Sequence, residues 1–256
     1  MPAWLMVPAA IAALLFLLPL IGLLTATPWG ELWPLITDDA TIDALSLSLE
    51  CSLASALLCL VLGLPLAMWL AHGNDALRTT VRVFATLPMV LPPIVGGLAL
   101  LLIYGKNHLV GGSLHRWFGI EVPFTTTGVV LATTYVAMPF FVLTVEAGLR
   151  GFDQRYAEAA ATLGAGPWRT FRTVTLPMIA PSVRAGLLVA WARALGEFGA
   201  TITFAGSFQG RTRTMPLAIH HAFEAKPDAA IALSLILLVV SAVVLFCLRR
   251  QWFPSR

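Results

Sequence analysis

The chain has 256 residues, of which 58% are hydrophobic and only 11% charged, and its formal net charge is +3. Because soluble domains carry about 25% charged residues, this composition excludes an ordinary soluble protein and predicts an integral membrane protein. The small positive excess gives no reason to expect a nucleic-acid partner.

Six apolar windows are each long enough to cross about 30 Å of hydrocarbon as a helix. In chain order they run approximately over residues 3–25, 45–71, 83–104, 127–149, 180–204 and 229–248. Backbone groups have no water to pair with inside a bilayer, and no alternating strand pattern is present. We therefore expect an all-α, polytopic helical membrane protein with about six transmembrane helices. The gaps are too short for a second globular domain, so residues 1–256 are predicted to form one integral membrane domain.

The first window lacks the basic region of a cleavable signal peptide and is long for its apolar part. We therefore interpret it as a retained helix, with cleavage near Ala26 as the less favoured alternative. The three cysteines and five histidines show no metal-ligand spacing, so we expect no metal site.

The basic residues predict the orientation. If the N-terminus is cytoplasmic, all charged residues of the first outer loop are acidic. The inner loops and the C-terminal tail then hold ten of the sixteen basic residues. These ten are Arg78, Arg82, Arg150, Arg155, Arg169, Arg172, Arg184, Arg249, Arg250 and Arg256. The positive-inside rule then predicts a cytoplasmic N-terminus and a cytoplasmic C-terminus.

Three prolines interrupt the third window, at Pro88, Pro92 and Pro93, and Gly96 and Gly97 follow closely. Each proline removes a backbone donor and kinks or breaks a helix. Two interpretations stay open: a gate in a transport pathway, or prolines of the kind that are common in membrane helices.

Residues 153–177 are an amphipathic, arginine-bearing interruption between the fourth and fifth windows. Asp153 is a good N-cap for a short helix over 154–163, which Gly164 and Gly166 can end before Pro167 opens a second helical turn. The pattern predicts a helix, a turn and a helix.

Small and bulky side chains in this segment suit a docking site for a cytoplasmic partner. Ala159 and Ala160 would let the partner's backbone approach, while Tyr156 and Leu163 could fill a groove. We expect Leu176 and Pro177 to end the loop and to fix how the chain re-enters the membrane. The alternative is a solvated connection without a partner.

The fifth window carries two charges, Arg193 and Glu197. A charge at the centre of a membrane helix costs about 2.5 to 3.5 kcal/mol on insertion scales, so both should face protein or a water-filled path. They are four residues apart, hence on one helical face and able to pair, and Thr201 would extend this polar stripe. The pair either locks helices together or lines a translocation pathway.

Two stretches resemble permeases of ABC importers. Residues 158–160 (Glu-Ala-Ala), Gly164 and, after a nine-residue gap, residues 174–177 have the spacing of the EAA loop of that family, with Val174 where isoleucine is commoner. Residues 192–201 and 210–219 together look like molybdate-type permeases, although sulfate permeases share the Ala-Arg-Ala-Leu-Gly-Glu part. Residues 207–209 depart from the usual turn. The resemblance spans roughly residues 45–248.

The resemblance implies an assembly: a second copy of the chain, two cytoplasmic ATPase subunits that bind ATP and Mg²⁺, and an extracytoplasmic substrate-binding protein, in a bacterial inner membrane. Its cargo would be molybdate or tungstate, with sulfate or thiosulfate as the alternative. Implied contacts with the ATPase are Glu158, Ala159, Ala160, Gly164, Leu176 and Pro177. The chain itself has no phosphate-binding loop, so we expect it to bind no cofactor.

Two functions from other classes remain as alternatives. One is a membrane enzyme that uses Arg193 and Glu197, but the sequence offers no nucleophile with a base, no metal cluster and no cofactor motif, so we expect no catalytic residue. The other is a membrane sensor that borrows an ATPase without moving cargo.

Overall fold

The computed structural model describes residues 3–73 and 75–252, and no strand occurs in these ranges. This confirms the all-α prediction. Arg256, counted above in the cytoplasmic tail, lies outside the described residues, as do the side chains of Arg249 and Arg250.

Five helical segments are long and apolar enough to cross a membrane, and a bent pair of helices makes a sixth candidate. The five are α1 (Met6–Ala26), α3 (Asp39–Leu58) continued by α4 (Leu64–Ala71), α8 (Thr126–Arg150), α10 (Pro167–Thr170) continued by α11 (Leu176–Leu195), and α14 (Pro227–Trp252). The bent pair is α5 (Ala76–Val90) and α6 (Pro93–Tyr104), between which the chain bends by 119°. The shorter helices are α2 (Leu32–Ile36), α7 (Leu109–Phe118), α9 (Arg155–Thr162), α12 (Gly199–Ala205) and α13 (Met215–Ala225).

The third predicted span is thus not one straight helix. Leu91 and Pro92 both have extended backbone angles (ψ 138° and 133°). A residue that precedes proline is driven out of the α conformation, and here Leu91 precedes Pro92 while Pro92 precedes Pro93. The double proline therefore breaks the chain, whereas Pro88 lies inside α5 without ending it.

The fifth predicted span also has different boundaries. Its helix begins well before residue 180, at Pro167, and ends at Leu195; residues 196–198 separate it from α12. Our expectation that Leu176 and Pro177 end the cytoplasmic loop is wrong, because both lie within this continuous helix.

A π-helical turn explains how Pro177 fits inside a helix. Residues 171–175 form this turn, and the N–H of Leu176 bonds to the carbonyl of Phe171, five residues back. In an α-helix a proline ring clashes with the carbonyl four residues earlier, and the wider turn relieves that clash. The same arrangement occurs before Pro65, where residues 59–63 are π-helical.

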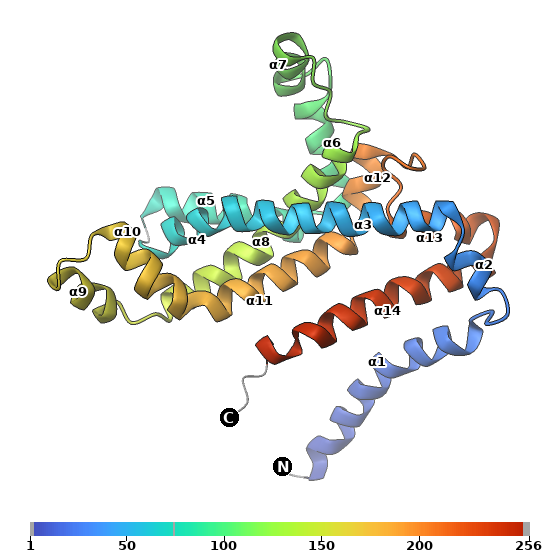
Figure 1. Cartoon of the computed structure of the whole chain (residues 1–256), viewed down its shortest axis with the longest axis horizontal. Helices are drawn as coiled ribbons and strands as arrows, with labels where there is room; N and C mark the ends of the chain where they lie inside the picture. Colours follow the sequence, from blue (N-terminus) through green and yellow to red (C-terminus); the bar gives the residue numbers. More distant parts are fainter. Residues whose placement is uncertain (1–2, 74, 253–256) are drawn as a thin grey trace.

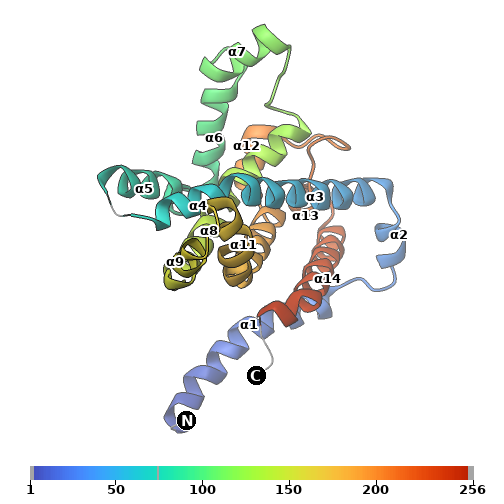
Figure 2. The ribbon, with the colours of Figure 1, turned by 60° about the vertical axis from the view of Figure 1, so that its left-hand side comes forward.

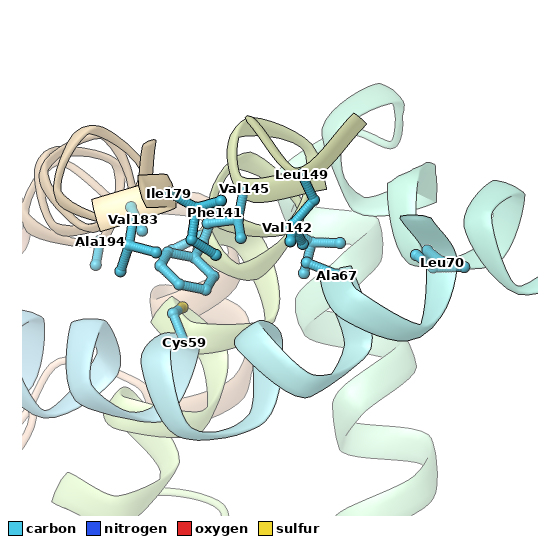
Figure 3. Close-up of a cluster of buried hydrophobic side chains, with 12 residues drawn as sticks. Cys59, Ala67, Leu70, Phe141, Val142, Val145, Leu149, Ile179, Val183 and Ala194 are labelled. Carbon is cyan, nitrogen blue, oxygen red and sulfur yellow. The ribbon is translucent and has the colours of Figure 1, made fainter. Parts of the chain in front are cut away.

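The core is built where α3, α4, α8 and α11 pack side by side (Figure 1). The ring of Phe141 on α8 lies among Cys59, Val183 and Ile179 (Figure 3). A Cβ on Gly63 would lie 2.7 Å from this ring and one on Gly186 would lie 3.2 Å from it. Small residues on neighbouring helices therefore make room for one large ring, as is usual for helices packed within a membrane.

The ends of this bundle differ. The helices α9 and α10 lie at one end, whereas α12 and α13 lie toward the other (Figure 1). The hairpin of α6 and α7 projects sideways from the bundle in both views (Figure 2). The predicted docking segment is thus far from the loop of residues 206–214.

Glycines allow α6 and α12 to cross in close contact. A Cβ on Gly97 would lie 2.7 Å from the carbonyl oxygen of Ala200 and 2.8 Å from the Cβ of Thr203. A Cβ on Gly199 would lie 2.8 Å from the Cβ of Pro93. Because the obstacles include backbone atoms, the two helices would have to move apart to accept a side chain.

We expect Gly97→Ala to destabilise the detergent-solubilised protein by about 1 to 3 kcal/mol, the usual cost of overpacking a core. Thermal unfolding measures this as a lower Tm. The control is Gly30→Ala, because a Cβ on Gly30 would meet nothing within 4 Å. Equal Tm values for the two variants would contradict the close crossing.

Candidate functional site

The short helix predicted within residues 153–177 is α9. Asp153 Oδ1 accepts a hydrogen bond from the N–H of Arg155 at 3.0 Å, so Asp153 caps the start of the helix as its sequence position suggests. Pro167 opens α10 as expected. The segment therefore forms a helix, a turn and a second helix.

Gly164 shapes the turn after α9. Its φ is +84°, a left-handed conformation that favours glycine. The N–H of Gly164 bonds to Ala161 O at 2.9 Å and the N–H of Ala165 bonds to Ala160 O at 3.0 Å. These two bonds are those of a Schellman motif, which satisfies the last carbonyls of a helix.

Large apolar side chains of this segment point outward. Tyr156 is 56% exposed, Leu163 is 88% exposed and Trp168 is 71% exposed. We call these three residues the α9–α10 surface. Trp168 was missed in the sequence analysis, although a tryptophan directly after a helix-opening proline in a polar segment is itself a signal. Large exposed apolar patches mark interaction sites, whereas single exposed apolar residues are common on protein surfaces.

Glu158 faces a different direction from that surface. It lines a small hollow with Ala157 and Gln154 of its own segment. The other walls come from the ends of α4, α8 and the π-helical turn: Ala71, His72, Leu149, Phe152 and Thr175. Ala159 is exposed and Ala160 is half-buried. The residues that the resemblance groups together therefore have different places in the structure. Glu158 borders a hollow in its own chain and Gly164 shapes a turn. Leu176 and Pro177 continue a helix.

At the break between α11 and α12, Glu197 contacts both helices. Its Oε2 lies 2.6 Å from Arg193 Nη2, and its Oε1 accepts the N–H of Ala200 at 2.8 Å. The Glu197 side chain is only 1% exposed and that of Arg193 is 29% exposed. The carboxylate thus joins the end of one helix to an otherwise unpaired donor at the start of the next.

Thr201 does not extend this polar stripe, because the helix ends before Glu197. It lies in α12, fully buried, and its hydroxyl has no hydrogen-bond partner within residues 3–73 and 75–252. The expected alignment of Arg193, Glu197 and Thr201 on one continuous helical face is therefore wrong.

The two helix breaks lie next to each other. The close approach of Gly199 to Pro93 places residues 196–199 beside the start of α6. Of the three prolines predicted to act in gating, Pro92 and Pro93 are at this junction and Pro88 is within α5.

The second motif of the resemblance, residues 210–219, forms a tight loop and the start of α13. The carbonyl of Phe208 accepts the N–H groups of Arg211, Thr212 and Arg213 at 3.1, 2.9 and 3.0 Å. Arg213 Nε also donates to Ser207 Oγ at 3.2 Å. The unusual residues 207–209 thus take part in the same turn.

Long-range hydrogen bonds fasten this loop to the bundle. Thr126 Oγ1 of α8 donates to Arg211 O at 2.9 Å, and Ser48 Oγ of α3 accepts the N–H of Met215 at 2.6 Å. In this structure the motif therefore connects α12 to α13 and is held against α3 and α8 by hydrogen bonds.

Comparisons with known proteins decide the family. Residues 63–251 match the family described as "Binding-protein-dependent transport system inner membrane component". The chain belongs to this family. It is therefore a multi-pass inner-membrane subunit of a transport system that works with a binding protein.

Curated relatives and solved structures agree with this membership. The chain is 44% identical over 244 residues to "Molybdenum transport system permease protein ModB" of Mycobacterium tuberculosis, covering 95% of this chain and 92% of the relative. It is 36% identical over 218 residues to the protein of the same name from Escherichia coli (strain K12), covering 85% of this chain and 95% of the relative.

Two solved ABC transporters show the fold alone, because their identity to this chain is low. One imports the acidic polysaccharide alginate; its chain has a TM-score of 0.78 at 20% identity, with 96% of this chain and 93% of that chain covered. The other is the MetNI methionine transporter, with a TM-score of 0.63 at 16% identity and coverage of 84% and 96%.

We expect Glu197→Ala to destabilise the protein more than Glu197→Gln. The glutamine amide oxygen can still accept the N–H of Ala200, whereas alanine leaves a buried donor unsatisfied at a cost of about 1 to 3 kcal/mol. Thermal unfolding of the purified variants measures the order. Glu224→Gln is the control, because Glu224 is 67% exposed and should change stability by less than about 0.5 kcal/mol. Glutamine and alanine variants of equal stability would show that Glu197 does not act as the cap.

Proposed function

We propose that this chain is the permease subunit of an ATP-driven importer of a tetrahedral oxyanion, namely molybdate or tungstate. The main support is the 44% identity, over 95% of the chain, to a permease named for molybdenum transport. Molybdate and tungstate are nearly the same tetrahedral dianion, so one pathway would accept both. Sulfate or thiosulfate is the alternative cargo, because it has similar shape and charge.

The proposed assembly contains two copies of this chain, two cytoplasmic ATPase subunits and an extracytoplasmic binding protein. The α9–α10 surface supports an ATPase contact, since Tyr156, Leu163 and Trp168 expose apolar groups at one end of the bundle. ATP and Mg²⁺ would bind to the ATPase, because the chain has no phosphate-binding loop. The arginine distribution supports cytoplasmic N- and C-termini.

Arg193 is the candidate for contact with the passing anion. Its guanidinium has five donors, of which those on Nη2 face Glu197. Glu197 is held on both sides, so we assign it the locking role that the sequence left open, and we assign Arg193 the pathway role. The neighbouring carboxylate would weaken anion binding at Arg193, as a conduit that must release its cargo requires.

The two adjacent helix breaks are the candidate gate. Movement of α6 against α12 would change the contact between Pro93 and Gly199 without bending either helix. Pro92 and Pro93 would act as the hinge, because their backbone cannot return to a continuous helix with α5.

Reconstitution tests the function directly. Vesicles that hold the chain with its ATPase and binding protein should accumulate labelled molybdate only when ATP is supplied, and tungstate should compete whereas excess sulfate should not. Uptake of sulfate with indifference to molybdate would favour the alternative cargo. ATP hydrolysis without uptake of any oxyanion would favour a sensor, and chemical conversion of a substrate would favour an enzyme.

The same vesicles separate the two roles of Arg193. An Arg193→Ala complex that assembles normally but no longer transports supports the pathway role. Loss of assembly would instead place Arg193 with Glu197 in holding the helices together.

The turn after α9 gives a prediction about coupling. We expect Gly164→Ala to weaken binding of the ATPase and to lower transport while membrane insertion is unchanged, because an alanine in the left-handed conformation costs about 1 to 2 kcal/mol. Co-purification of the ATPase with the chain measures the effect. Gly166→Ala is the matched control, since Gly166 has φ −67° and open space around it. Equal behaviour of the two variants would argue against a role for the turn.

A further inference from the structure

A buried carboxylate at the same end of the bundle as α9 was not singled out by the sequence analysis. Glu146 of α8 is only 5% exposed. Its Oε1 accepts Arg82 Nε at 3.0 Å and Arg150 Nε at 3.0 Å, and Arg82 Nη2 lies 2.8 Å away. Arg82 Nη2 also donates to the carbonyl of Leu70 at 3.0 Å. We call these four groups the Glu146 cluster.

The cluster joins three helices. Leu70 is in the last turn of α4, where carbonyls lack partners within the helix, so Arg82 supplies the missing donor from α5. Glu146 and Arg150 are one turn apart on α8. The ends of α4 and α8 are thereby tied to the side of α5.

The start of α5 is fixed as well. Asp75 Oδ1 accepts the N–H of Arg78 at 2.9 Å, and this hydrogen bond, with the nearby Arg78 guanidinium, lowers the pKa of Asp75 below its usual value. Asp75 stays charged at neutral pH and caps the helix. The connection between α4 and α5 is therefore held at Leu70 on one side and at Asp75 on the other.

The cluster lies next to the hollow that α9 borders. Leu149 follows Glu146 by three residues, Ala71 follows Leu70, and both line the hollow together with Ala157 and Glu158. From the cluster, α5 continues to the break at Leu91 and Pro92 and then to α6. Across this hollow α9 thus faces the ends of α4 and α8 that carry the cluster, and α5 leads from the cluster to the candidate gate.

Stability alone does not account for a charged cluster at this position. Replacing buried ion pairs with packed apolar residues is often neutral or stabilising. In the described part of the chain, Glu146 Oε2 is buried and accepts no hydrogen bond, so the carboxylate is only partly compensated. What the four groups of the cluster achieve is a fixed geometry between helices.

We propose that Glu146 is a positioning residue for energy coupling. It holds the ends of α4 and α8 and the side of α5 as one rigid body, so that displacement of α9 moves α5 and, through the proline break, α6. This inference rests on the proposed function, because it requires an ATPase that acts on α9.

The test compares transport with ATP hydrolysis in vesicles that hold the complete complex. Glu146→Gln should still assemble and hydrolyse ATP, but the oxyanion moved per ATP should fall at least about fivefold, the lower end of typical coupling effects. Glu121→Gln is the control. Glu121 lies in the exposed connection between α7 and α8, where its carboxylate pairs with Lys106 at 2.6 Å. This variant should leave the ratio of oxyanion moved to ATP hydrolysed unchanged. An unchanged ratio in Glu146→Gln would overturn the proposal.

A second variant distinguishes coupling from folding. Arg82→Cys with Glu146→Cys, in a chain whose three native cysteines are replaced by alanine, can be bridged by a short thiol-reactive linker. We expect a low ratio before bridging and recovery after it, because the linker restores the tie between α5 and α8. Bridging without recovery, or failure of all Glu146 variants to assemble, would overturn the proposal. A wild-type complex that moves no oxyanion would instead overturn the proposed function on which it rests.

Discussion

The structure depends on one constraint: backbone polar groups and charges within the bilayer must find partners inside the protein, because lipid offers none. Continuous helices meet this requirement, and each departure from a helix shows how the requirement is kept. At the break between α5 and α6, two successive residues are prolines without N–H groups, and the N–H of Leu91 is still bonded to Leu87. The break thus leaves few donors to satisfy.

The break between α11 and α12 solves the same problem with a side chain. Glu197 accepts the N–H of Ala200 and is itself neutralised by Arg193. Glycine at position 199 then lets this break pack against Pro93. The two interruptions therefore pack against each other at one junction. At the opposite end, the Glu146 cluster applies the same principle to the last turns of α4 and α8.

Much of the architecture could be predicted from the sequence, because it follows from local rules. Apolar length placed the first, fourth and sixth spans within a few residues, whereas the third span is broken at the double proline and the fifth begins earlier and ends at Leu195. The sequence Gly-Ala-Gly-Pro after α9 predicted a helix stop and a restart, and Gly164 has the positive φ that this requires. The pairing of Arg193 with Glu197 followed from their spacing. Glu146 could have been found by the rule that pointed to Glu197, since it is also a carboxylate within an apolar window.

Other features depend on residues distant in sequence and could not be predicted. Pro177 was expected to end a loop, but a π-helical turn shifts the hydrogen bonds and lets the helix continue. Thr201 was expected on a polar stripe, but the chain leaves the helix at residue 196, where packing against α6 and the cap from Glu197 favour a break. The motif at residues 210–219 resembles that of permeases, and its hydrogen bonds with Ser48 and Thr126 fasten it to α3 and α8.

By itself, the sequence determined that this protein is a bundle of membrane helices with a polar helix-turn-helix segment between two of them, because hydrophobic length and turn chemistry are local properties. Only the tertiary structure decided where two broken helices meet, which carboxylate caps which helix, and that Arg82 reaches Glu146. Those contacts join positions up to 106 residues apart, such as Pro93 and Gly199, and no local rule fixes which distant helices will pack together.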